Sequence, residues 1–173
     1  MTALETTQDR ETDLNEQARR QLEALCVFLR EHGARHFYSQ WPAEMLEALV
    51  YFHARQRTLA WVAERGVRSA ECGVQGIGFA TQLSECQVRK AVASGQTALL
   101  DWLPDFSGGN CLLLGHFACS NPQTLRAVMR ALARRFPSWR SLKLFTFRWR
   151  HGQPVLHGIS RRAIDRLLMK GAV

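Results

Sequence analysis

Residues 111–136 read CLLLGHFACSNPQTLRAVMRALARRF. The first nine letters form a near-continuous apolar run, which is typical of a strand buried on both faces of a sheet. Asn121 and Pro122 then supply an N-cap and a first-turn proline, so we expect a helix from there to about Phe136. Because another apolar strand follows at residues 141–150, this stretch predicts a right-handed βαβ unit with two parallel strands.

The flanking sequence predicts further helices and strands around this unit. Apolar residues at helical or alternating spacing favour helices over 13–32, 42–57, 84–94 and 160–168, and strands over 58–64, 76–83 and 154–157. We therefore expect an α/β fold in which a mixed central sheet carries helices on both faces. Residues 1–12 are expected to be a disordered lead-in, and residues 13–173 a single domain.

The composition fits one globular domain of 173 residues, with 46% hydrophobic and 22% charged residues. No apolar stretch reaches the roughly 18–20 residues that a membrane helix needs. The start, MTALETTQDRETD, lacks the features of a signal or transit peptide, so we expect a cytoplasmic protein with no membrane span. Five cysteines without a CxxC pair predict reduced thiols and no metal site.

The positive charge is concentrated in the last third of the chain. From Ser120 onward there are twelve Lys and Arg against one acid, Asp165, whereas residues 1–119 carry eleven basic and fourteen acidic residues. Such a lopsided field attracts polyanions or acidic proteins to one part of the molecule.

Three motifs resemble those of a known family. They are YSQWPAEM (38–45), SGGNCLLLGHFA (107–118) running on to ALARRFP (131–137), and LHGISRRAIDRLL (156–168). In order and spacing, residues 36–168 resemble the bacterial toxin-activating lysine acyltransferases, which have a GNAT-like fold. The resemblance implies a GNAT-like mixed sheet and an acyltransferase that moves an acyl group from acyl carrier protein to a lysine of an unidentified protein acceptor.

The resemblance also implies which residues are catalytic. Tyr38 stands where the family has a histidine, with His36 two residues earlier, and Gly115 stands where it has an aspartate, next to His116. Acyl transfer to lysine needs a base for the ammonium proton, and histidine suits that task. We therefore expect His36 and His116 to converge on one cleft, with Tyr38 as an acid toward the leaving thiol.

The loop CSNPQT lacks the glycines that would let backbone N–H groups bind the pyrophosphate of coenzyme A, and its proline removes a donor. No tightly bound cofactor is expected, and acyl carrier protein is favoured over acyl-CoA as the donor. Because carrier proteins are acidic, we expect the donor to dock on the next helix, on Asn121, Arg126, Arg130 and Arg134.

Three alternatives stay open. Cys119 precedes a helix N-terminus, where a thiolate could be stabilised and form an acyl-cysteine. The chain could instead be an inactive GNAT-like protein that only binds its partner. The oligomeric state also stays open, with a homodimer as one possibility. It could also be a nucleic-acid-binding module, because aromatic and basic residues alternate along one strand: Lys143, Phe145, Phe147, Arg148, Trp149 and Arg150.

Overall fold

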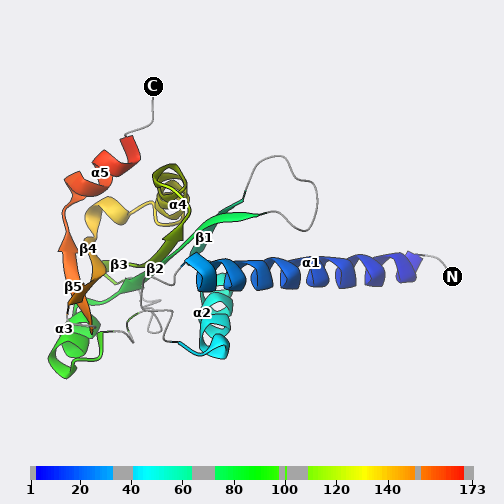
Figure 1. Cartoon of the computed structure of the whole chain (residues 1–173), viewed down its shortest axis with the longest axis horizontal. Helices are drawn as coiled ribbons and strands as arrows, with labels where there is room; N and C mark the ends of the chain where they lie inside the picture. The colour runs from blue at the N-terminus through cyan, green and yellow to red at the C-terminus, as the bar shows by residue number, and fades with distance from the viewer. Residues whose placement is uncertain are drawn as a thin grey trace.

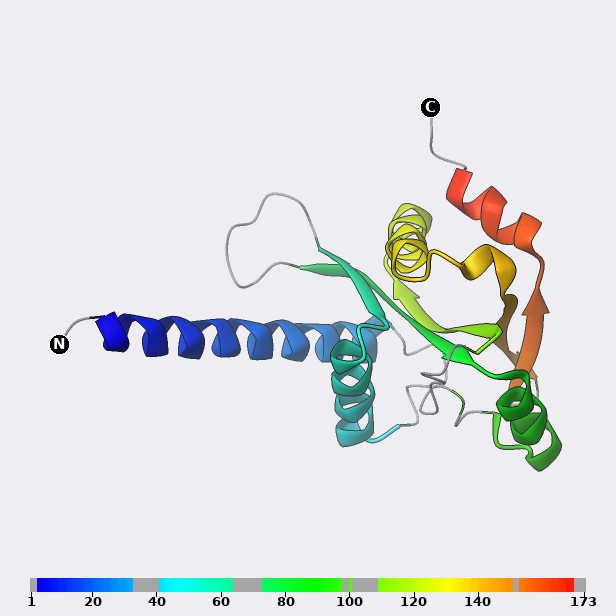
Figure 2. The same ribbon diagram turned by 180° about the vertical axis from the view of Figure 1, so that it is seen from behind.

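A computed structural model describes residues 3–32, 41–63, 73–97, 100, 109–150 and 153–169, with side chains except those of residues 3–15, 116, 149, 153 and 154. These residues form a mixed α/β structure, as the sequence predicts (Figures 1 and 2). The helices are α1 (Ala3–His32), α2 (Ala43–Arg55), α3 (Glu85–Ser94), α4 (Pro122–Arg135) and α5 (Arg161–Met169). A short 3-10 helix, η3, spans Trp139–Ser141.

Within the described residues the sheet has five strands in the order β1-β2-β3-β4-β5. They are β1 (Leu59–Ala63), β2 (Val74–Leu83), β3 (Cys111–Cys119), β4 (Lys143–Arg150) and β5 (Gln153–Ile159). Strands β3 and β4 are parallel, and every other neighbouring pair is antiparallel. The expected parallel pair joined by a helix is confirmed, and the strand around Leu113 lies in the middle of the sheet.

Helices cover both faces of the sheet, as expected (Figure 1). On one face, α1 and α2 pack on a cluster that includes Ile77 and Phe79 of β2. On the other, α4 and α5 pack on a cluster that includes Leu112 and Leu114 of β3. A third cluster joins α3 to β3 through Val88 and neighbouring strand residues. The alternation of strand side chains thus separates the core into layers on either side of the sheet.

Helix α1 differs from the expected lead-in and helix. It begins at Ala3, ten residues before the predicted start at Asp13. Residues 3–12, ALETTQDRET, contain neither glycine nor proline, and a helix already nucleated further on can propagate through them. The N-terminal half projects away from the sheet (Figures 1 and 2).

Helix α4 approaches β2 closely because β2 has glycine at two positions on the face that α4 covers. A Cβ atom at Gly78 would lie 2.6 Å from ring atoms of Phe117 and 2.7 Å from Cγ1 of Val128, and one at Gly76 would lie 2.5 Å from Cγ2 of Thr124. These distances are shorter than any real carbon–carbon contact. The glycines therefore set how near the helix of the βαβ unit comes to the sheet.

His53 of α2 is completely buried in the α1/α2 layer. Its Nδ1 lies 2.7 Å from the hydroxyl oxygen of Thr58, and that oxygen lies 3.3 Å from the carbonyl oxygen of His53. Nε2 has no hydrogen-bond partner. Burial lowers the pKa of His53 from 6.5 to about 4, because the core disfavours the charged imidazolium.

We predict that Gly78→Ala lowers the free energy of unfolding by about 1–3 kcal/mol, since the new methyl group has to displace Phe117 or Val128. The measurement is urea denaturation. Gly158→Ala is the matched control, because nothing lies within 4 Å of its Cβ position. Equal stability of the two variants would show that α4 does not need the close approach.

We also predict an acid-labile core. The pKa of His53 is lower in the folded state than in the unfolded chain. The contribution of neutral His53 to the free energy of unfolding is therefore complete above pH 6.5 and is lost as the pH falls toward 4. The loss reaches about 3 kcal/mol over that window. Urea denaturation at several pH values should give a smaller loss for His53→Leu than for the wild type, and parallel curves would contradict the prediction.

Candidate functional site

The parallel strands β3 and β4 pair over only part of their length. Cys111 to Leu114 pair with Lys143 to Thr146. Beyond these residues β3 continues to Cys119 and β4 to Arg150, but the two strands no longer pair with each other. The two strands therefore diverge after Leu114 and Thr146. We call this divergence the fork. Along it, the facing backbone N–H and C=O groups of β3 and β4 have no partner in the opposite strand.

A β-bulge in β3 lies at the start of the fork. Between Leu114 and Phe117, β3 has two residues, Gly115 and His116, whereas β2 opposes them with Phe79 alone. An extra residue bends a strand and increases its twist, and bulges are frequent beside active sites. The bulge thus explains why β3 turns away from β4 at this point.

A histidine that was not among the predicted catalytic residues lies one strand away from the fork. Thr146, the last residue of β4 that pairs with β3, is opposite His157 of β5. By strand alternation both lie on the face of Leu144, which packs beneath α4 and α5. The side chain of His157 is half-buried. Its only signal in the sequence is the His-Gly pair in the third family-like motif.

The three predicted catalytic residues are only partly placed by the structure. His36 and Tyr38 lie outside the described residues. His116 lies in the bulge of β3, but only its backbone is described. Of the three predicted catalytic residues, His116 is thus the one whose backbone is placed at the fork.

Asn121, predicted to contact the donor, caps helix α4. Its Oδ1 accepts hydrogen bonds from the backbone N–H of Thr124 at 2.8 Å and from the Thr124 hydroxyl at 3.1 Å. Its Nδ2 donates to the hydroxyl of Ser120 at 3.2 Å. Such a cap is worth about 1 kcal/mol, and it occupies the acceptor of the side chain. Asn121 therefore has a structural role at the end of β3.

The three predicted arginines of α4 have different environments. Arg130 and Arg134 are exposed, as expected, and Arg130 donates to the carbonyl of Leu168 in α5 at 3.2 Å. Arg126 is half-buried, and its Nε has no acceptor. No carboxylate of the described residues forms an ion pair with any of the three. Their positive charge is consequently available to a partner.

Cys119 does not have the properties of a nucleophile. Its thiol is half-buried at the end of β3 near Gly76, and burial raises its pKa to about 11. The protonated thiol is a poor nucleophile at neutral pH. The raised pKa speaks against the acyl-cysteine that the position before α4 suggested.

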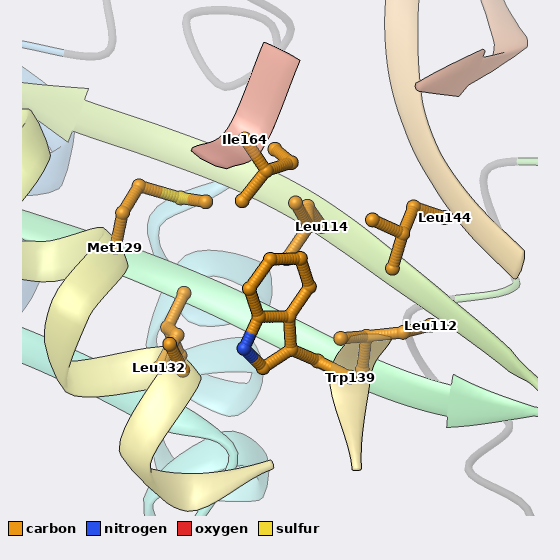
Figure 3. Close-up of a pocket in the computed structure, with 8 residues that line it drawn as sticks. Leu112, Leu114, Met129, Leu132, Trp139, Leu144 and Ile164 are labelled. Carbon is orange, nitrogen blue, oxygen red and sulfur yellow. The ribbon is translucent and has the colours of Figure 1, made fainter. Parts of the chain in front are cut away.

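A small cavity lies between α4, α5 and the paired part of β3 and β4 (Figure 3). It has a volume of about 20 Å³ and is lined by apolar side chains only, including Leu114, Trp139 and Ile164. It is large enough for one water molecule but offers no hydrogen bond, so it stays dry. It is a packing gap beneath α5, without chemistry of its own.

Neither a metal centre nor a membrane helix is found in the part of the chain that the structure describes. No group of three or more His, Cys, Asp and Glu side chains there could hold a metal ion. Likewise, no helix there is long and apolar enough to cross a membrane.

We predict that iodoacetamide at pH 8 alkylates Cys86 much faster than Cys119. Cys86 is exposed, whereas the Cys119 thiol is half-buried and stays protonated well above this pH. Peptide mass spectrometry after timed quenching gives both rates. Equal rates would restore Cys119 as a candidate nucleophile.

A scan against models of protein families finds none that matches this chain, and a search of curated proteins finds no match.

Proposed function

We propose that this protein is an acyltransferase that moves an acyl group from acyl carrier protein to a lysine of another protein. The observation that carries the proposal is the fork: two parallel strands of the central sheet that separate after Leu114 and Thr146, with a bulge at Gly115 and His116. The fork offers an acyl donor backbone groups that β3 and β4 do not use to pair with each other, at a break in the middle of the sheet.

The prosthetic arm of a carrier protein is a narrow chain with amide groups. Backbone N–H and C=O groups along the fork could bind those amides as they would bind an added strand. The peptide N–H groups of the bulge would then stabilise the oxyanion that forms when an amine attacks the thioester. In this arrangement the acyl carbon lies near the bulge, where the two strands part.

His157 is the described side chain best suited to accept the proton of the attacking lysine. It lies opposite Thr146 at the start of the fork. Lysine attacks as the free amine, so its ammonium form must first give up a proton, and histidine is a suitable acceptor. His36, Tyr38 and His116 remain candidates for the same role or for protonating the thiolate that leaves.

The arginines of α4 would receive the acidic carrier. Arg126, Arg130 and Arg134 follow one another at four-residue spacing from the end of α4 that adjoins β3. None is paired with a carboxylate of the described residues, so the field of this helix face is not neutralised. Unpaired arginines speed the encounter with an acidic protein and bind its carboxylates through two hydrogen bonds.

The nucleic-acid alternative receives less support. It requires the aromatic side chains of β4 to form an open stacking platform. Phe145 and Phe147 are half-buried and pack against the cluster beneath α3. These two rings therefore act as core residues and are not open for stacking on bases.

The first test is binding of acylated carrier protein by isothermal titration calorimetry at moderate salt. The double variant Arg126→Glu/Arg130→Glu should bind at least about tenfold more weakly, since it reverses two charges on the docking face. The matched control is Arg30→Glu/Arg89→Glu, which changes net charge equally on α1 and α3. Equal losses, or unchanged binding in both, would count against docking on α4. Tight, salt-sensitive binding of single-stranded nucleic acid without carrier binding would favour the alternative.

The second test separates chemistry from binding. Intact-mass spectrometry can follow loss of the acyl group from the carrier and its arrival on lysine. His157→Gln should slow transfer about 100-fold while carrier binding is kept, because it removes the base and leaves the docking face unchanged. His32→Gln on α1 is the control. Full activity of His157→Gln would assign the base to another residue, and absence of transfer by the wild type would leave only a binding protein.

A further inference from the structure

A second concave site lies far from the fork, where α1, α2, β1 and the C-terminal end of α4 meet. It is a hollow of about 280 Å³, close to the lower end of the range for small-molecule sites. Two arginines, Arg57 and Arg135, and the aromatic ring of Trp61 line it, together with Gln21 and several aliphatic side chains. None of the nine lining residues carries a carboxylate.

Two backbone carbonyls orient the side chain of Arg135. Its Nη1 donates to the carbonyl of Arg57 at 3.1 Å and also to that of Leu59. These carbonyls orient the guanidinium but do not neutralise it. Its Nε and Nη2 form no hydrogen bond that competes with a ligand among the described residues. A fixed guanidinium loses little side-chain entropy when it binds an anion, so it suits a binding site.

Arg57 stands where a glycine is usual. Helix α2 ends in a Schellman motif, in which Thr58 N–H donates to the carbonyl of His53 at 2.9 Å and Arg57 N–H to that of Ala54 at 3.1 Å. The motif places Arg57 in the left-handed region, with φ of 57°. That conformation costs a residue with a side chain about 1 kcal/mol relative to glycine. The second guanidinium of the hollow is therefore placed there at the expense of stability.

We propose that this hollow binds a small organic anion, with its carboxylate, sulfonate or phosphate on Arg57 and Arg135 and a flat apolar body against Trp61. The two guanidinium groups supply charge-assisted hydrogen bonds, which are the strongest kind available to an anion. Trp61 is half-buried, and the aliphatic wall formed by Leu22, Leu25 and Leu59 excludes water from the apolar part. The proposal does not depend on acyl transfer, because the fork lies at the other end of α4.

The probe is 8-anilinonaphthalene-1-sulfonate, an aromatic anion whose fluorescence rises in an apolar site, titrated into the full chain. Its neutral counterpart is N-phenyl-1-naphthylamine, which has the same rings without the sulfonate. We expect saturable binding of the sulfonate at about one per chain, and binding of the neutral amine about tenfold weaker. Equal affinity for the two would overturn the proposal, because the arginines would then contribute nothing.

Variants locate the site. Arg57→Gly and Arg135→Gln should each weaken binding of the sulfonate about tenfold, whereas Arg134→Gln, an exposed neighbour that does not line the hollow, should not. Glycine suits the left-handed position, so Arg57→Gly should keep or raise the melting temperature and still lose affinity. Unchanged affinity in Arg57→Gly, or an equal loss in Arg134→Gln, would overturn the proposal even if Arg135→Gln fails to fold.

Discussion

The parallel contact between β3 and β4 is the constraint on which the rest of this structure depends. It consists of four residue pairs, and parallel strands can only be joined by a crossover, so α4 has to lie across the sheet. The crossover brings the N-terminus of α4 to the end of β3 and its C-terminus back toward β1. The extent of this pairing sets where the fork begins, and α4 carries Arg135 to the hollow that α1, α2 and β1 complete.

Helix α4 connects the fork and the hollow, with its N-terminal end beside the fork and its C-terminal end beside the hollow. It has fourteen residues, which correspond to a length of about 21 Å. Its N-terminal cap, Asn121, holds the turn beside the fork, and its last arginine, Arg135, reaches the backbone of β1. The glycines of β2 allow the helix to lie close enough for both contacts. A shift of α4 away from the sheet would therefore disturb both sites at once.

Several polar residues of this protein have structural rather than chemical roles. Asn121 caps a helix, His53 shares hydrogen bonds with Thr58 inside the core, and Cys119 is kept protonated by burial. In each case desolvation or a nearby backbone donor outweighs the reactivity of the isolated side chain. The proposed acyl transfer relies instead on His157, on the bulge of β3 and on the arginines of α4, which have no carboxylate partner among the described residues.

The sequence by itself determined the layers of the fold. The apolar run CLLLGHFAC predicted a buried strand, and Asn121 with Pro122 marked the start of α4, because both signals arise from local backbone chemistry and periodicity. The sequence also shows that the excess of positive charge lies in the last third of the chain. The sequence before Asp13 contains neither glycine nor proline, which permits a helix there. The longer α1 nevertheless depends on cooperative propagation from the packed part of the helix.

Only the tertiary structure decided which residues meet. The register of β3 against both neighbours creates the bulge and the fork, and no local pattern in the strand specifies where pairing stops. In the same way, pairing of β4 with β5 places His157 opposite Thr146, and Arg57 meets Arg135 across 78 residues of sequence. Such contacts arise from the packing of distant elements, whereas sequence periodicity reports only which face of each element is buried.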